Sequence, residues 1–465
     1  MSNLVLGMFA VAIAATTACD FPTGEYCEGT VAAAPVEAEP PERQSLVVAQ
    51  VLPTEYTAVD VLFVIDDSRS MMDEQEQLAI WSSELFDVLS LSGELADLHV
   101  AVISSSVSIP GLEGCEYAGN GAFHVGGAAL QGDRFIRDVA GEIARERNYE
   151  GSLTQTFAEM ARVGDDGCGF EQPFEATRLA LAGSVPGTEE FLRDEALLLV
   201  VFVTDEDDCS ASDPSLYSDP YADACSALGP RTSYRCFEHG VRCYDGKASR
   251  VFGARENCRA DEGSPYVDSV SSFARHLRSL KAHPAQVVVA GIYGKPHQVA
   301  TVRDEQITAY AAPRLANVCD TGGDEGTGAT PAVRMNALMT EFPARASQSS
   351  ICAADLSWAL RDAGLAARAA ASRSHCLRGS LVDIDTAAPG VQPSCRVDVI
   401  SNAGTAQEAQ LELPACDGTG GARCFTIDVD ALACPDTDTQ LAFAVSDGAA
   451  NETLTATCDV APPPL

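Results

Sequence analysis

Lysine is nearly missing from this chain, where it occurs only as Lys247, Lys281 and Lys295. The 30 basic residues are therefore almost all arginine, and they face 67 acidic residues, which gives a formal net charge of -37 at pH 7. A charge of this sign and size repels phosphate groups, so we expect no nucleic-acid partner. Compositional bias or adaptation to salty surroundings is the plain explanation of this charge, and a functional acidic field is the alternative.

Catalytic motifs are missing too. The seven histidines are scattered along the chain, and Ser68 lacks the glycine-flanked turn of a hydrolase nucleophile. No Cys-x-x-Cys pair is present, so His239 between Cys236 and Cys243 does not predict a zinc site. We therefore expect a protein that is not an enzyme.

Long apolar runs are confined to the start of the chain. Residues 4–15 are apolar and lead into Thr16-Thr17-Ala18-Cys19, which resembles a bacterial lipoprotein signal. Removing Cys19 as a lipidated N-terminus leaves 17 − 1 = 16 cysteines, an even number suited to disulfides in an oxidising compartment. We expect residues 1–19 to be a signal and Cys19 a membrane lipid anchor in the cell envelope, on the outer surface or in the periplasm. A cleaved secretory signal and a short membrane anchor are the alternatives.

The rest of the chain divides into three parts by composition. Residues 20–50 are rich in Ala, Pro and Glu and predict a flexible tether. Residues 57–377 alternate apolar runs with helical stripes, which predicts an α/β domain with a doubly wound, mostly parallel sheet. Its predicted strands are residues 59–65, 98–103, 197–204 and 287–292. Residues 209–265 show neither period and hold five cysteines, so we expect a disulfide-rich insertion.

Residues 378–465 contain short alternating runs separated by Gly, Asp and Pro, which predicts a small all-β, sandwich-like domain. The chain from Cys376 onward holds six cysteines, an even number that could form disulfides with one another: Cys376, Cys395, Cys416, Cys424, Cys434 and Cys458.

One segment indicates a specific chemistry. The apolar run of residues 59–65 ends in Asp66-x-Ser68-x-Ser70, which would place one carboxylate and two hydroxyls in a single turn. Hard cations such as Mg²⁺ take oxygen ligands of this kind. A capped turn is the plain alternative, because Ser and Asp commonly accept bonds from the first free N–H groups of a helix.

The pattern resembles the metal-ion-dependent adhesion site of von Willebrand factor type A domains. A second apolar run, residues 197–203, ends in Thr204-Asp205, which matches another loop of that family. The resemblance implies that Ser68 and Ser70 contact the cation directly and that Asp66 acts through water, while Asp205 takes the role of the third-loop aspartate. It also implies that a partner's carboxylate completes the coordination of the ion.

The middle loop departs from the family, because residues 164–171 contain no threonine. Asp165, Asp166 or Glu171 would have to supply its oxygen, and we include Asp166 in the expected metal set of Asp66, Ser68, Ser70 and Asp205. The neighbouring Glu206, Asp207 and Asp208 are expected to form a solvated loop.

These observations predict an exported, lipid-anchored protein that binds a carboxylate-bearing protein or glycan partner through Mg²⁺, Mn²⁺ or Ca²⁺. The alternative is a structural envelope or matrix protein whose disulfide-stapled domain lacks working metal chemistry. A metal-dependent hydrolase that uses the acidic loop is a third reading.

Overall fold

The computed structural model describes residues 44–51, 56–91, 94–116, 118–183, 186–305, 312–319 and 328–371. Toward the C-terminus it describes residues 377, 381–385, 387, 391–401, 408–416, 423–429, 441–445 and 452–460. Cys19, the predicted signal and most of the predicted tether lie outside these residues. Over the described ranges, no helix has the length and apolar character needed to cross a membrane.

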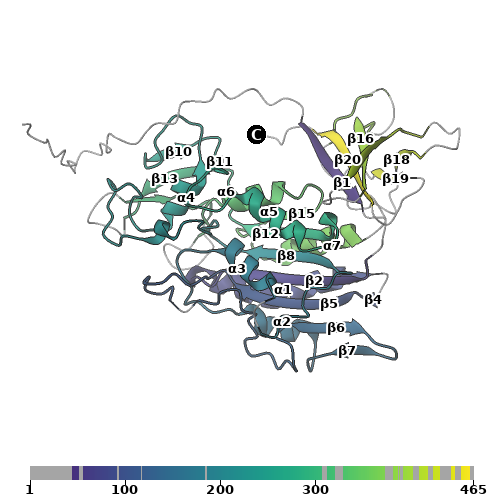
Figure 1. Cartoon of the computed structure of the whole chain (residues 1–465), viewed down its shortest axis with the longest axis horizontal. Coiled ribbons are helices and arrows are strands. Elements are labelled where there is room, and N and C mark those ends of the chain that lie inside the picture. Colours follow the sequence, from purple (N-terminus) through teal and green to yellow (C-terminus); the bar gives the residue numbers. More distant parts are fainter. Residues whose placement is uncertain are drawn as a thin grey trace, which may run out of the picture.

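A seven-stranded sheet forms the centre of the larger domain (Figure 1). Its first five strands are parallel to their neighbours, whereas the last two are antiparallel. The predicted mostly parallel sheet is confirmed, and each of its four predicted strands is present. The strand order is β15 (Ala346–Ser350), β12 (Val287–Tyr293), β8 (Leu197–Val203), β2 (Ala58–Ile65), β5 (Asp97–Ser104), β6 (Ile136–Ala140) and β7 (Arg145–Arg147).

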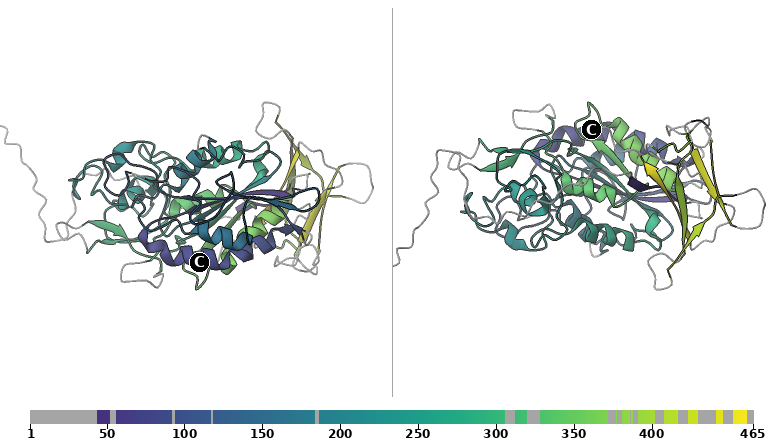
Figure 2. Two further views of the ribbon diagram at one scale, coloured as in Figure 1. Left: turned by 90° about the horizontal axis from the view of Figure 1, so that it is seen from below. Right: turned by 90° about the horizontal axis from the view of Figure 1, so that it is seen from above.

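Helices cover both faces of this sheet (Figure 2). Strand β2 is apolar except for Asp60, so Val61 and Phe63 pack into one layer while Leu62 and Val64 pack into the other. This is the pattern expected of a strand buried on both sides. One layer contains α1 (Met72–Val88), α2 (Leu153–Ala161) and α7 (Ser357–Ala371), and the other contains α3 (Pro173–Leu181), α5 (Val270–Ser279) and α6 (Val333–Thr340). The short elements η1 (Arg69–Met71), β3 (Ser90–Leu91), β4 (Glu94–Leu95) and η3 (Pro284–Gln286) connect them.

The predicted insertion after β8 is present and is cross-linked by Cys209–Cys236 and Cys243–Cys258. The zinc reading of Cys236 and Cys243 is thereby excluded, and Cys225 is disulfide-bonded as well. The insertion contains η2 (Pro214–Tyr217), α4 (Tyr234–Gly240), β9 (Val241–Arg242), β10 (Gly253–Arg255) and β11 (Arg259–Ala260). It is larger in space than predicted, because β10 pairs with β13 (Val299–Arg303), which in turn pairs with β14 (Pro313–Leu315).

The C-terminal region is all-β, as predicted. Its four-stranded sheet has the order β1 (Gln44–Val51), β20 (Glu452–Val460), β16 (Cys395–Ser401) and β17 (Ala409–Leu413), and a second sheet pairs β18 (Phe425–Val429) with β19 (Leu441–Val445). Phe425 packs with Val397 and Ala456 in the core between them. Disulfides join Cys395 to Cys458 and Cys416 to Cys424, whereas Cys376 and Cys434 lie outside the described residues.

Two predicted boundaries need correction. The tether was expected to run to residue 50, but residues 44–51 form β1, which pairs with β20 along its length. Leu377 was placed at the end of the α/β domain, but it is fully buried in the β core. Both corrections have the same cause: the β domain recruits chain from each side of the α/β domain to complete its sheet and core.

The β domain contacts the end of the α/β domain at which the parallel strands begin. His283, just ahead of β12, lies with its Nε2 2.6 Å from Thr453 Oγ1 of β20. The insertion lies at the other end of the sheet, where the parallel strands finish (Figure 2). The loops that follow β2 and β8 therefore lie at the same end of the sheet as the insertion.

A buried ion cluster secures the beginnings of the strands. Asp60 of β2 is fully buried and accepts from Lys281 Nζ at 3.0 Å and from Arg193 Nε at 2.8 Å. Lys281 has a fully buried side chain as well, so each charge depends on the others for its solvation.

We expect Asp60→Asn to lower the free energy of unfolding by roughly 3–5 kcal/mol, because it leaves the Lys281 ammonium buried without its counter-ion. The matched control is Glu76→Gln, which breaks the exposed pair with Arg162 and should cost less than about 1 kcal/mol. Chemical denaturation measures both, and equal losses in the two variants would contradict the assignment.

Candidate functional site

The finishing ends of β2 and β8 bring two distant loops together. The sheet continues one bond beyond both strands, because Asp66 N donates to Val203 O at 2.9 Å. Thr204 Oγ1 then donates to Asp66 Oδ2 at 2.7 Å. Asp66 is 1% exposed and Asp205 is 2% exposed, so the two predicted carboxylates are buried as neighbours. The sequence analysis did not predict that Thr204 orients Asp66. The position of Thr204 directly before Asp205 could have indicated that its hydroxyl lies at the same site.

The two predicted serines follow at η1, which Ser68 precedes as the N-cap and which contains Ser70. Ser68 N donates to Asp66 Oδ1 at 2.8 Å, and the hydroxyls of Ser68 and Ser70 share a hydrogen bond with their oxygens 3.1 Å apart. The Ser68 side chain makes no capping bond to the start of the helix, so the capped-turn reading does not explain this hydroxyl. Adjacent ligands of an octahedral Mg²⁺ are separated by about 3 Å, which matches the spacing of these two oxygens.

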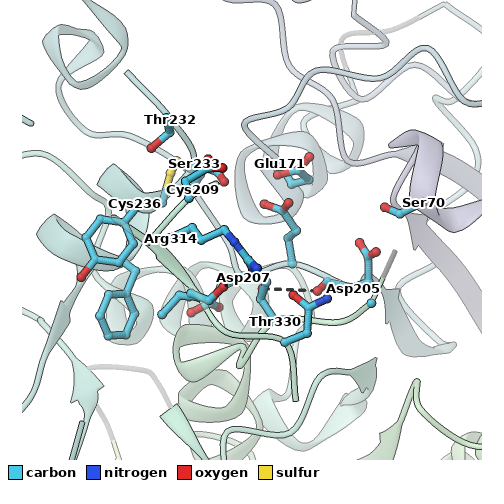
Figure 3. Close-up of a pocket in the computed structure, with 17 residues that line it drawn as sticks. Ser70, Glu171, Asp205, Asp207, Cys209, Thr232, Ser233, Cys236, Arg314 and Thr330 are labelled. Carbon is cyan, nitrogen blue, oxygen red and sulfur yellow. Dashed lines mark hydrogen bonds between the residues drawn. A yellow bond between two sulfur atoms is a disulfide. The ribbon is translucent and has the colours of Figure 1, made fainter. Parts of the chain in front are cut away.

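Asp205 carries an oxygen without a partner. Its backbone carbonyl accepts from Thr330 N at 2.8 Å, but Asp205 Oδ1 is buried and has no hydrogen bond among the described atoms. Glu74 Oε2, from the first turn of α1, is likewise buried without a hydrogen-bond partner among the described atoms. Figure 3 shows Asp205 and Ser70 directed toward one another from the two loops.

The last two residues of the acidic run, Asp207 and Asp208, are structural. Asp207 accepts from the backbone N–H groups of Arg334 and Met335 at 2.9 and 3.0 Å, at the start of α6. Asp208 is fully buried and pairs with Arg334 Nη2 at 2.8 Å. The expected solvated loop is therefore wrong for these two residues, because each carboxylate anchors α6 to the end of β8.

The middle loop is fixed by three contacts. Gln75 Nε2 donates to Gly164 O at 2.7 Å, Gly167 N donates to Asp67 O at 2.8 Å, and a disulfide joins Cys168 to Cys115. A Cβ at Gly167 would lie 2.5 Å from Asp67 O, so this close approach requires glycine.

This anchoring separates the three acidic candidates of the middle loop. Asp165 and Asp166 are exposed, and neither lines the cavity described below. Glu171 is 2% exposed and lines that cavity together with Asp205. The structure thus does not bring Asp166 to the other predicted ligands, whereas Glu171 is the middle-loop acid that lies beside Asp205 in the cavity wall.

The buried carboxylates influence one another. Burial first, and then the nearby Asp205 charge, raise the pKa of Asp66 to about 7. Burial and the Glu206 charge raise the pKa of Asp205 to about 7. The pKa of Glu206 is also raised to about 7, first by burial and then by Asp66, and burial raises the pKa of Glu171. Without a counter-ion, this cluster holds protons near neutral pH.

A cavity of about 220 Å³ opens between these loops and the insertion (Figure 3). Its walls combine carboxylates, hydroxyls and some apolar surface. It is lined by Ser70, Glu171, Asp205, Glu206, Asp207, Cys209, Thr232, Ser233, Tyr234, Cys236, Phe237, Asp304, Arg314, Leu315, Asn317, Gly328 and Thr330. The part contributed by the insertion was not predicted.

These residues fit a hard cation. Buried carboxylates are normally paired, protonated or bound to metal, and Asp205 Oδ1 is left open beside two hydroxyls at ligand spacing. Within the described ranges, no three His, Cys, Asp or Glu side chains form a metal-ligand group. A cation here would therefore depend on the serine hydroxyls and on water.

Comparison with known proteins adds little. No protein-family model matches the chain, and no curated protein matches it. Among solved structures, the pilus adhesin SpaC from Lactobacillus rhamnosus GG is similar, with a TM-score of 0.30 and 9% identity. The match covers 88% of this chain and 40% of the adhesin, so the chain spans less than half of that protein.

We predict that the cation-free protein loses stability as pH rises. Asp66 and Asp205 ionise near pH 7 in the folded state but near pH 4 when unfolded, so the folded state binds more protons between these values. The free energy of unfolding, measured in EDTA, should therefore fall between pH 5 and pH 8 by roughly a few kcal/mol.

Asp205→Asn should flatten this slope, whereas Asp165→Asn, an exposed acid in the middle loop, should leave it unchanged. A slope in Asp205→Asn as steep as that of the unaltered protein would show that the cluster does not cause it.

Proposed function

We propose that this protein contains a von Willebrand factor A-like domain that binds a divalent cation, Mg²⁺ foremost, and through it an acidic group on a protein or glycan partner. Two observations at one site carry the proposal together. Asp205 Oδ1 is buried without a hydrogen-bond partner among the described atoms, and the hydroxyl oxygens of Ser68 and Ser70 lie 3.1 Å apart. A doubly wound sheet binds its ligands at this edge, outside the finishing ends of its strands.

Each residue has a definite part in the proposed site. Ser68 and Ser70 contact the ion through their hydroxyls, while Asp66 and Asp205 neutralise its charge through water. Thr204 and the Ser68 backbone N–H hold both oxygens of Asp66 and so fix its orientation. The bound ion supplies a positive charge, and a carboxylate of the partner completes the coordination of that ion. This is binding chemistry, and we propose no catalytic step.

Export follows from the cysteines. Six disulfides join pairs of described cysteines, which fits a protein of an oxidising compartment outside the cytosol. Five of these disulfides are described above, and the remaining one, Cys319–Cys352, lies shortly before the start of α7. We further propose that Cys19 is lipidated and that residues 20–43 hold the folded part away from a membrane.

Mg²⁺ or Mn²⁺ should bind the purified protein and stabilise it. An ion present at a hundredfold excess over its Kd stabilises the folded state by about 2.7 kcal/mol. We expect Ser68→Ala to abolish both the calorimetric binding signal and this gain, because it removes one of two hydroxyl ligands. The control is Ser279→Ala, which removes an exposed hydroxyl of α5 and should bind the ion as before.

Equal, negligible ion binding by the unaltered protein and by Ser68→Ala would contradict the proposal. It would favour the alternative of a structural envelope or matrix protein, which the disulfides flanking the cavity also suit. In that case, EDTA should leave thermal stability unchanged at every pH while a reductant lowers it sharply. The cation-binding protein should instead respond to both treatments.

A further inference from the structure

The cavity beside the proposed ion site extends away from it into the insertion. Ser70 and Asp205 lie at one part of its wall, and Phe237 and Leu315 contribute apolar surface elsewhere. Glu171 and Glu206 also line it. The cavity thus combines a pair of acids with apolar walls, next to the position of the ion.

The two glutamates have no basic partner. Among the described residues, neither Glu171 nor Glu206 takes part in an ion pair, and their side chains interact with one another. Asp207 and Asp208 differ, since α6 satisfies both through its backbone N–H groups and Arg334. The glutamate pair is therefore the part of the acidic wall that the fold leaves without a positive charge.

Two buried oxygens that line the same cavity have no hydrogen-bond partner among the described atoms. Asp205, which is 2% exposed, has its Oδ1 without a partner, and so does Thr232 Oγ1 across the cavity in the insertion. A buried polar atom of this kind costs about 1–3 kcal/mol unless a ligand or water satisfies it.

We propose that this cavity receives a basic side chain, lysine or arginine, of the partner protein whose carboxylate binds the ion. The inference rests on the proposed function and narrows the partner to a protein segment with an acidic and a basic residue close together. The aliphatic part of such a side chain packs against Phe237 and Leu315 while its charged end meets Glu171 and Glu206. An acidic glycan offers no such cation, and a volume of about 220 Å³ accommodates the side chain.

Arg314 is a basic residue of this chain that lines the same cavity and competes with a basic ligand. It lines the cavity from β14 but is exposed, and its Nη1 donates to Leu315 O at 3.0 Å rather than to either glutamate. Removing this charge should strengthen the binding of a basic group.

The test uses the purified full chain in saturating Mg²⁺ and fluorescent blocked peptides in which Asp and Lys are separated by zero, one or two glycines. Each peptide has a matched partner with norleucine in place of Lys, which reports on the ion and the carboxylate alone. We expect the best Lys peptide to bind roughly tenfold more tightly than its norleucine match. Glu206→Gln should reduce this ratio toward one, Arg314→Ala should increase it, and the control Asp165→Asn should leave it unchanged.

The outcomes separate the two proposals. Mg²⁺-dependent binding with equal affinity for Lys and norleucine peptides would overturn the basic-side-chain pocket and leave the ion site standing. A preference for Lys that persists in EDTA would support the pocket and contradict the ion. If Glu206→Gln and Arg314→Ala both leave the ratio unchanged, or if no peptide binds, the pocket is rejected.

Discussion

The parallel hydrogen bonding of β2 to β8 is the constraint on which the candidate site depends. All seven residues of β8 are buried, so apolar burial on both faces of the sheet keeps this strand beside β2. The ladder then continues past both strands to Asp66 and forces the next side chains, Asp66 and Thr204, into contact. Two carboxylates of like charge become buried neighbours as a result, at a cost that the strands' apolar contacts offset.

The sequence was sufficient for the part of the fold that has a strong local pattern. Apolar runs predicted β2, β5, β8 and β12 to within about one residue at each end, because strands buried on both faces are near-continuous runs of apolar residues. The same reasoning placed Asp66 and Asp205 at one edge of the sheet, where the structure has them. That Ser68 and Ser70 bind an ion stays a prediction.

The remaining features depend on distant contacts that leave no local pattern. Strand β15 reads Ala-Ser-Gln-Ser-Ser and is a strand only because β12 pairs with it. Strand β1 exists because β20, about four hundred residues later, accepts it. The choice between Asp166 and Glu171 was likewise beyond the sequence, since it depends on how Gln75 and the Cys115–Cys168 disulfide orient the middle loop.

The disulfides and the acidic cavity are physically connected. Carboxylates that repel one another across two loops push those loops apart, and here each loop is cross-linked beside its acid: Cys168 three residues before Glu171 and Cys209 three residues after Glu206. The net charge of -37 adds to this repulsion over a longer range. Both effects favour a positive ligand in the cavity, since it relieves the local repulsion and is drawn in by the whole molecule's field. The same charges would repel an acidic partner, so under the proposed function the cation must bind before a carboxylate is recognised at this surface.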